Sequence, residues 1–269
     1  MTIHTKRVIT TFVSIPFLIG IIYFAPSWIF TILILFAALV SLTEFYAIVR
    51  PKAAEKTVFL NYLLTALLFL SLLGKDLFYI AIFPLFVIFP LGFSIFGYSK
   101  DHPKMGDIGQ VILGPFYICL PLAFLAIIAR LPQGHLWVFF ILAITFAGDT
   151  CSFYVGRFFG RHKLTRISPG KTWEGALGGL IANVVSAGVY AWLFFPSLSV
   201  NSLMVLGIII GISGQVGDLA ESMLKRMSNT KDSGNILPGH GGMLDRIDSF
   251  LFAIPVLYVY LNYWGLFPL

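Results

Sequence analysis

Long apolar runs separated by short polar segments dominate the hydrophobic pattern of this chain. Runs of about 17–25 mostly apolar residues are long enough to cross a lipid bilayer as helices, and nine such runs are present. They are Val8–Ala25, Ser27–Val49, Val58–Gly74, Leu77–Tyr98, Ile108–Ala129, His135–Phe159, Trp173–Phe195, Ser202–Leu224 and Ser249–Phe267. Because helices satisfy their own backbone hydrogen bonds in lipid, the pattern predicts an all-α polytopic integral membrane protein with about nine transmembrane helices.

The distribution of basic residues predicts the orientation. With a cytoplasmic N-terminus, 16 of the 18 Lys and Arg residues fall on the cytoplasmic side, and only Lys75 and Arg130 fall on the other. Cytoplasmic loops of membrane proteins carry such an excess. We therefore expect a multi-pass protein of the cell (inner) membrane, with polar cytoplasmic loops at residues 160–172 and 225–248. The first run lacks a small-residue cleavage site, so we expect it to be a retained helix.

Composition excludes two other classes of protein. The chain is 58% hydrophobic and 11% charged, whereas soluble domains are about 25% charged. An aromatic content of 16% is the opposite of a disordered composition. The net charge of +6 is explained by the cytoplasmic loops, so we expect no nucleic-acid partner. Cys119 and Cys151 stand in apolar runs and indicate neither a disulfide framework nor a metal site.

The two halves of the chain differ in chemistry. Residues 1–134, with about five spans, hold 8 of the 25 glycines, and residues 135–269 hold 17. Glycine lets transmembrane helices approach closely, so we expect residues 135–269 to form a tightly packed catalytic helical bundle. The spacings Gly175-xxx-Gly179 and Gly207-xxx-Gly211 indicate such helix packing.

Acidic residues are concentrated in the second half, where seven of the twelve Asp and Glu lie between positions 149 and 248. Asp149 and Asp218 fall within or at the ends of apolar spans, where a carboxylate costs roughly 2.5–3.5 kcal/mol on the insertion scale. Each is expected to face a polar cavity with a partner, or else to make an interhelical hydrogen bond. One helical face carries four polar residues, Asp218, Glu221, Ser222 and Lys225. Carboxylates with basic groups one to two turns along suit a hard cation beside phosphate.

The loop at 225–248 mixes charge with a glycine-rich turn at Pro238–Gly242. Glycine tolerates the dihedral angles that expose backbone N–H groups to an anion. Asp245 and Asp248 follow, one turn apart, as the last predicted helix begins. Either carboxylate is suited to Mg²⁺, and either is equally suited to capping the helix.

At this loop the sequence resembles the phosphatidate cytidylyltransferase (CDP-diacylglycerol synthase) family. Residues 222–248 contain Ser222, Lys225-Arg226, Lys231-Asp232, the Pro238-Gly-His240-Gly-Gly turn and Asp245-Arg246-Ile-Asp248, which match every fixed position of the family signature. Ser168-Pro-Gly-Lys171-Thr172-Trp-Glu174-Gly175 is similar to a second family element, and Gly148-Asp149 and Gly156-Arg157 are similar to others. The resemblance covers roughly residues 145–250.

The resemblance implies a reaction that joins CTP and phosphatidate to give CDP-diacylglycerol and pyrophosphate, with Mg²⁺ and room for a second cation. It implies that Asp218 and Asp245 are Mg²⁺ ligands. Asp149 and Asp248 would be further ligands, or would contact the ligands without binding the ion. Phosphates would be held by the basic residues Lys225, Arg226, Lys231 and Arg246. Ser168, Lys171, Thr172 and Ser222 would bind nucleotide or lipid headgroup, and His240 would donate to a phosphate or shape the turn.

Two other functions remain open on the sequence alone. A CTP-dependent polyprenol-type lipid kinase would release CDP rather than pyrophosphate. A secondary transporter would use Asp149 and Asp218 as coupling-ion sites, although transporters usually have two matched halves. We also expect a homodimer, since the glycine-poor helices need partners or lipid.

Overall fold

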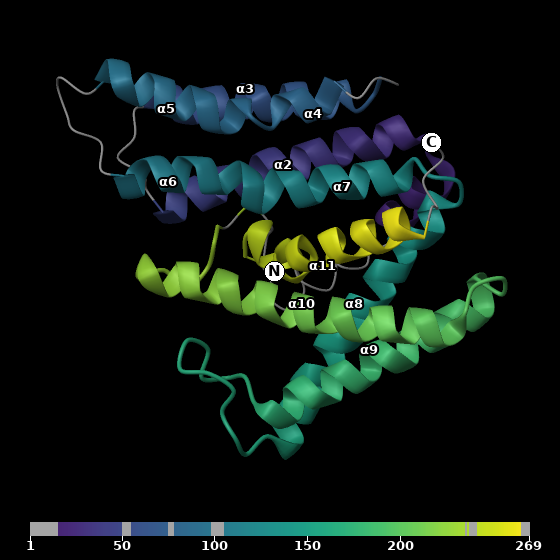
Figure 1. The fold of residues 1–269 in the computed structure, drawn as a ribbon. Helices are drawn as coiled ribbons and strands as arrows, with labels where there is room; N and C mark the ends of the chain where they lie inside the picture. Colours follow the sequence, from purple (N-terminus) through teal and green to yellow (C-terminus); the bar gives the residue numbers. More distant parts are fainter. Residues whose placement is uncertain are drawn as a thin grey trace, which may run out of the picture. The chain divides into compact units, whose positions relative to one another are not determined.

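The computed structural model describes residues 16–49, 55–74, 78–97, 105–234, 236 and 241–264, and these are mostly helical (Figure 1). Residues 16–24 are helical, and the named helices follow. They are α2 (Ser27–Val49), α3 (Glu55–Ser71), α4 (Phe78–Ile82), α5 (Leu85–Gly97), α6 (Met105–Gly114), the π-helical turn η1 (Pro115–Cys119), α7 (Leu120–Ala129), α8 (Gly134–Phe159), α9 (Trp173–Phe194), α10 (Val200–Met227) and α11 (Leu244–Tyr263). The all-helical prediction is confirmed for this part of the chain.

Five continuous helices are long and apolar enough to cross a membrane. They are Ser27–Val49, Met105–Ala129, Gly134–Phe159, Trp173–Phe194 and Val200–Met227. Each coincides with a predicted run to within three residues at either end. These five helices support the prediction of a membrane protein. The cytoplasmic orientation of the N-terminus stays a prediction.

Among the described residues, the other four predicted runs are not matched by helices long and apolar enough to cross a membrane. The run at Leu77–Tyr98 divides into α4 and α5 at Phe83–Pro84, where the chain turns. The run at Ser249–Phe267 belongs to α11, which begins earlier, at Leu244, so charged residues occupy its first turns. Of the first run, residues 16–24 are described as helix. Nine crossings thus stay a sequence prediction.

Contacts divide the chain into two compact units, and each is described by itself. Unit 1 comprises residues 1–127 and 230–245, and unit 2 comprises residues 128–229 and 246–269. The sequence analysis placed the whole loop at 225–248 with the C-terminal bundle. The structure instead groups residues 230–245 with the N-terminal helices, since Ser233, Met243 and Leu244 donate hydrogen bonds to Glu44 of α2.

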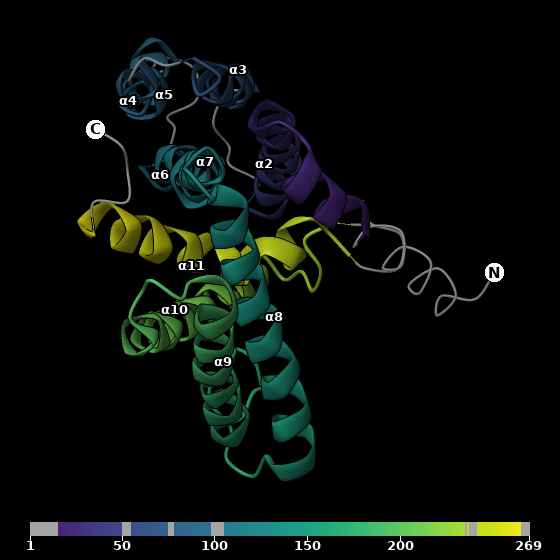
Figure 2. The ribbon, with the colours of Figure 1, turned by 90° about the vertical axis from the view of Figure 1, so that its right-hand side faces the viewer.

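Unit 1 contains a cluster of buried polar side chains that bond to the backbone of α6. Its helices α3, α4 and α5 pack in one layer beside α2 and the α6–α7 pair (Figures 1 and 2). Pro115 has no N–H, so the carbonyl of Val111 lacks its helical donor. Tyr46 Oη donates to this carbonyl at 2.8 Å, and Asn61 Nδ2 donates to it at 2.9 Å. The π-helical turn at Pro115–Cys119 is thereby satisfied by side chains from α2 and α3.

Unit 2 depends on close helix contact at glycine. Helices α8 and α9 run side by side, and α10 packs against both (Figure 2). A Cβ on Gly179 would lie 2.8 Å from the carbonyl oxygen of Gly148, and one on Gly207 would lie 3.0 Å from that of Asn183. Both glycines therefore let backbones meet, and the packing role predicted for the glycine spacings is confirmed.

We predict that Gly179→Ala destabilises the protein by about 1–3 kcal/mol, since the added methyl overpacks the contact between α8 and α9. Gly109→Ala is the matched control, because its Cβ would meet nothing within 4 Å and alanine favours the helix. Thermal unfolding in detergent, followed by circular dichroism, measures both. Equal midpoints for Gly179→Ala and the unsubstituted protein would contradict the packing argument.

Candidate active site

The loop at 160–172 is an ordered hairpin rather than an open linker. Leu164 N donates to the carbonyl of Lys171 at 2.9 Å, and Trp173 N donates to that of His162 at 3.0 Å. At the tip, Lys171 N donates to the carbonyl of Ser168 at 3.0 Å. The Ser-Pro-Gly-Lys segment is therefore a tight turn that fixes the backbone of Lys171.

The same loop is fastened to the start of α9. Thr172 is the N-cap of this helix, and its Oγ1 accepts a hydrogen bond from Gly175 N at 3.1 Å. The carboxylate of Glu174 accepts from Arg161 N at 3.1 Å and contacts His162 Nδ1 at 2.6 Å. A carboxylate in the first turn also complements the helix dipole. Thr172, predicted to bind substrate, thus has a structural role as a cap, and Glu174 is the residue that closes the hairpin.

Lys171 reaches from this loop to α10. Its Nζ forms an ion pair with Oδ2 of Asp218, and both side chains are partly exposed, at 26% and 36%. Two residues predicted from separate motifs, 47 positions apart in the sequence, are therefore in direct contact in unit 2.

Three carboxylates share the surroundings of this ion pair. Asp149 on α8 interacts electrostatically with Asp218 and with Lys171. Asp248 on α11 interacts electrostatically with Asp218, Asp149 and Lys171. Three of the four predicted metal ligands are thus brought into one electrostatic neighbourhood, with the Lys171 ammonium beside them.

The backbone of Asp248 on α11 lies against Gly217 of α10. A Cβ on Gly217 would lie 2.6 Å from the carbonyl oxygen of Asp248, so glycine is needed next to Asp218. Asp248 is outside the five helices of membrane-spanning length. Burial raises the pKa of its carboxyl to about 7, and repulsion from Asp218 adds to this rise. Because α11 begins at Leu244, Asp248 stands inside the helix, which excludes the capping role that the sequence left open for it.

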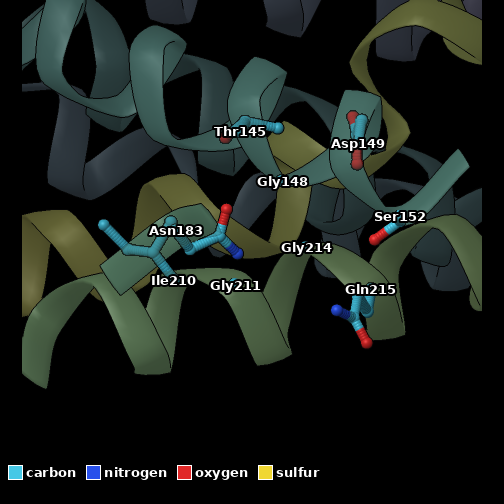
Figure 3. Close-up of a pocket in the computed structure, with 9 residues that line it drawn as sticks. All are labelled: Thr145, Gly148, Asp149, Ser152, Asn183, Ile210, Gly211, Gly214 and Gln215. Carbon is cyan, nitrogen blue, oxygen red and sulfur yellow. The ribbon is translucent and has the colours of Figure 1, made fainter. Parts of the chain in front are cut away.

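A small polar cavity adjoins Asp149 between α8, α9 and α10 (Figure 3). Its volume is about 10 Å³, enough for about one water molecule. The buried Oδ1 of Asn183 and the buried Oγ1 of Thr145 meet no hydrogen-bonding partner among the described residues. The lining consists of Thr145, Gly148, Asp149, Ser152, Asn183, Ile210, Gly211, Gly214 and Gln215. Sequence analysis missed Asn183, although an amide inside an apolar span is a recognisable signal.

Asp245 belongs to unit 1, where its carboxylate hydrogen-bonds to residues near both ends of its loop. Its carboxylate accepts from Gly242 N at 2.9 Å and from Ser233 N at 3.1 Å. Its own N–H donates to Ser233 Oγ at 3.3 Å. Asp218 lies in unit 2, so ligation of one ion by Asp218 and Asp245 together stays a prediction.

A carboxylate from the first half of the chain holds this loop, and the sequence analysis missed it. Glu44 of α2 is 4% exposed. It accepts hydrogen bonds from Met243 N at 3.0 Å and Leu244 N at 2.8 Å. The available signal was a single charged residue in the run Ser27–Val49, because ionisable groups inside membrane spans mark functional sites.

The remaining predicted residues are basic or polar groups, of which Lys225, Ser222 and Arg226 lie on α10 and Arg246 lies on α11. Lys225 forms an ion pair with Glu221, whose side chain is 1% exposed, so part of its charge is already balanced. Ser222 is half-buried on the same helix, and Arg226, Lys231 and Arg246 are exposed. Ser168 is half-buried. His240 lies outside the described residues.

The donor chemistry of unit 2 suits Mg²⁺ bound together with phosphate. Within the described residues no three His, Cys, Asp or Glu side chains converge closely enough to enclose a metal by themselves. Mg²⁺ usually takes one or two protein carboxylates and fills its other positions with water and substrate phosphate. Asp149, Asp218 and Asp248 supply such oxygens, and their mutual repulsion would be relieved by a cation.

Comparison with known proteins gives one consistent result. The model of the cytidylyltransferase family matches residues 5–264. A phosphatidate cytidylyltransferase from Synechocystis sp. is 31% identical over 95% of this chain and 96% of its own length. An uncharacterised protein from Escherichia coli (strain K12) is 32% identical over 95% of this chain and 86% of its own.

A shorter but more similar match is the phosphatidate cytidylyltransferase of Bacillus subtilis. It is 38% identical over 161 residues, which are 59% of this chain and 60% of that protein. The chain therefore aligns with less than two thirds of the Bacillus protein and with nearly all of the Synechocystis one.

We predict that Thr172→Val lowers stability by about 0.5–2 kcal/mol, the usual contribution of an N-cap hydroxyl. Thr172→Ser keeps the hydroxyl and is the matched control. Thermal unfolding in detergent compares the two. If valine leaves the unfolding midpoint unchanged and instead weakens nucleotide binding, Thr172 binds substrate and is not primarily a cap.

Proposed function

From the premise that this chain belongs to the cytidylyltransferase family, we propose that it is a phosphatidate cytidylyltransferase. It joins CTP to phosphatidate and yields CDP-diacylglycerol and pyrophosphate. The observation that carries the proposal is the neighbourhood of Asp149, Asp218, Asp248 and Lys171, formed by residues of the motifs that resemble this family. The names of the Synechocystis and Bacillus relatives support the same activity.

The reaction presents a problem of charge rather than of nucleophile activation. The phosphate monoester of phosphatidate is largely ionised near neutral pH, because its second pKa is about 6. One of its oxygens forms a bond to the α-phosphorus of CTP, and the bond from that phosphorus to the bridging oxygen of the β-phosphate breaks. Two anions must meet in line, so positioning and positive charge supply the catalysis.

A divalent cation held by these carboxylates would offset the repulsion between the two anionic substrates. Asp218, with Asp149 and Asp248, would hold Mg²⁺, which neutralises the triphosphate and the leaving pyrophosphate. Lys171 forms an ion pair with Asp218. With Asp218 holding the cation, Lys171 would be free to bind a substrate phosphate at the same place.

Exposed basic residues supply the other phosphate contacts. Arg226 and Arg246 can each bind a phosphate through two parallel N–H groups, and Lys231 adds a point charge. Lys225, Ser222, Ser168 and His240 are assigned to substrate binding on the family motif, and Asp245 is assigned as a metal ligand on the same basis.

The membrane setting follows from the substrates. Phosphatidate keeps its acyl chains in the bilayer, and CTP comes from water. Five helices of spanning length with charged groups near the ends of α8, α9 and α10 suit a site at the depth of the lipid headgroups. We propose that this side faces the cytoplasm, as the distribution of Lys and Arg indicates, and that the enzyme is a homodimer.

Purified protein in detergent micelles with phosphatidate, Mg²⁺ and CTP labelled in its cytosine ring tests the activity. We expect a lipid-soluble cytidine product with one pyrophosphate per turnover, and none after chelation with EDTA. Release of CDP with a phosphorylated lipid would instead identify a lipid kinase. No reaction of CTP with any lipid would contradict the proposal and leave a transporter to be tested.

Asp218→Asn tests the role of the carboxylate neighbourhood. We predict that kcat/KM falls at least about 100-fold, because even the loss of a residue that hydrogen-bonds to a metal ligand lowers activity or metal affinity about 10–100-fold. Asp107→Asn, at the start of α6 in unit 1, is the control and should keep near-native rates. Single-turnover kinetics at saturating Mg²⁺ measure both, and a native rate for Asp218→Asn would remove its metal role.

A further inference from the structure

Glu44 is the single charged residue of α2, and its side chain is 4% exposed. An ionised carboxylate at such a position requires several hydrogen bonds to offset the loss of hydration. Its donors come from a segment about 190–200 positions later in the sequence, residues 233–244. Both segments belong to unit 1, where the loop lies beside α2 (Figure 2).

The carboxylate receives three hydrogen bonds at the start of α11. Oε1 accepts from Met243 N at 3.0 Å, and Oε2 accepts from Leu244 N at 2.8 Å. Oε2 also accepts from Ser233 Oγ at 3.1 Å. The first N–H groups of a helix have no partner within the helix, and negative charge there is favourable. Glu44 therefore caps α11 from another helix.

Two glycines of this loop make room for the carboxylate. A Cβ on Gly234 would lie 2.5 Å from Oε1 of Glu44, and a Cβ on Gly242 would lie 2.6 Å from Oε2. Any larger residue at either place would have to displace Glu44 or the loop. The loop is therefore shaped around a carboxylate that lies outside the motif.

Ser233 connects this contact to Asp245. Its Oγ donates to Glu44 and accepts from Asp245 N at 3.3 Å, while its own N–H donates to the Asp245 carboxylate at 3.1 Å. We propose that Glu44 is a positioning residue of the nucleotidyl transfer, which holds the loop and the Asp245 carboxylate in the geometry that binds the divalent cation. This inference rests on the proposed function for its catalytic meaning, whereas the positioning itself is measurable without it.

Glu44→Gln tests the inference, because it keeps the size of the side chain and replaces one accepting oxygen with a donor. Thr43→Val is the matched control, because Thr43 is the exposed neighbour on α2 and its hydroxyl donates within that helix, to the carbonyl of Leu39 at 2.8 Å. Two readouts need no turnover. Hydrogen exchange, read by mass spectrometry, reports on the amides of residues 241–245, and Mn²⁺ titration followed by electron paramagnetic resonance gives the metal affinity.

We expect exchange at these amides to be at least 10-fold faster in Glu44→Gln and the Kd for Mn²⁺ to rise about 10-fold, with neither change in Thr43→Val. Glu44→Asp, which keeps the charge, should recover part of both. Unchanged exchange would overturn the proposal. Faster exchange with native Mn²⁺ affinity would also overturn it, because Glu44 would then stabilise the loop without positioning a ligand.

A second variant covers the case in which Glu44→Gln does not fold. Ser233→Ala removes the link between Glu44 and Asp245 but leaves both backbone donors to Glu44, and it should raise the Kd for Mn²⁺ to a similar extent.

In enzyme assays, the Mg²⁺ concentration for half-maximal rate should rise while the KM for phosphatidate stays unchanged. If the unsubstituted protein forms no cytidine lipid, the proposed function fails, yet exchange and Mn²⁺ binding still decide the role of Glu44.

Discussion

The account depends on the repulsion among carboxylates held together next to apolar helices. Burial raises the pKa of the Asp248 carboxyl, and the charges of Asp218 and Asp149 add to this rise. The Lys171 ammonium, paired with Asp218, balances part of the charge. In water such charges would be screened, but in a partly buried site their interaction is much stronger. A divalent cation is the natural counter-charge, and with it the site attracts a triphosphate. The same repulsion between the carboxylates therefore favours binding of the metal and nucleotide.

The rest of unit 2 keeps these groups in place. Glycines at positions 179, 207 and 217 bring α8, α9, α10 and α11 close enough that aspartates on three different helices act on each other. The hairpin closed by Glu174 and capped by Thr172 fixes the backbone of Lys171. Rigid support of this kind matters because catalysis by positioning loses much of its effect when groups shift by about 1 Å.

Sequence analysis predicted those features that depend on local pattern. Apolar runs of spanning length predicted the five long helices to within three residues at either end, and the motif residues Lys171 and Asp218 form an ion pair. It did not predict the early start of α11 at Leu244, because the N–H groups there are capped by Glu44, a side chain distant in the sequence. Glu44 was missed because its donors are about 190–200 positions away, and no local pattern connects them.

The most direct test of the central claim is to observe a divalent cation on the aspartates themselves. Protein labelled with ¹³C in its aspartate carboxyl groups is loaded with Mn²⁺, and pulsed electron paramagnetic resonance records the coupling of the ion to nearby carbon nuclei. The account predicts aspartate couplings that weaken or vanish in Asp218→Asn and persist in Asp107→Asn. Bound Mn²⁺ with no aspartate coupling, or a spectrum that Asp218→Asn leaves unchanged, would contradict it.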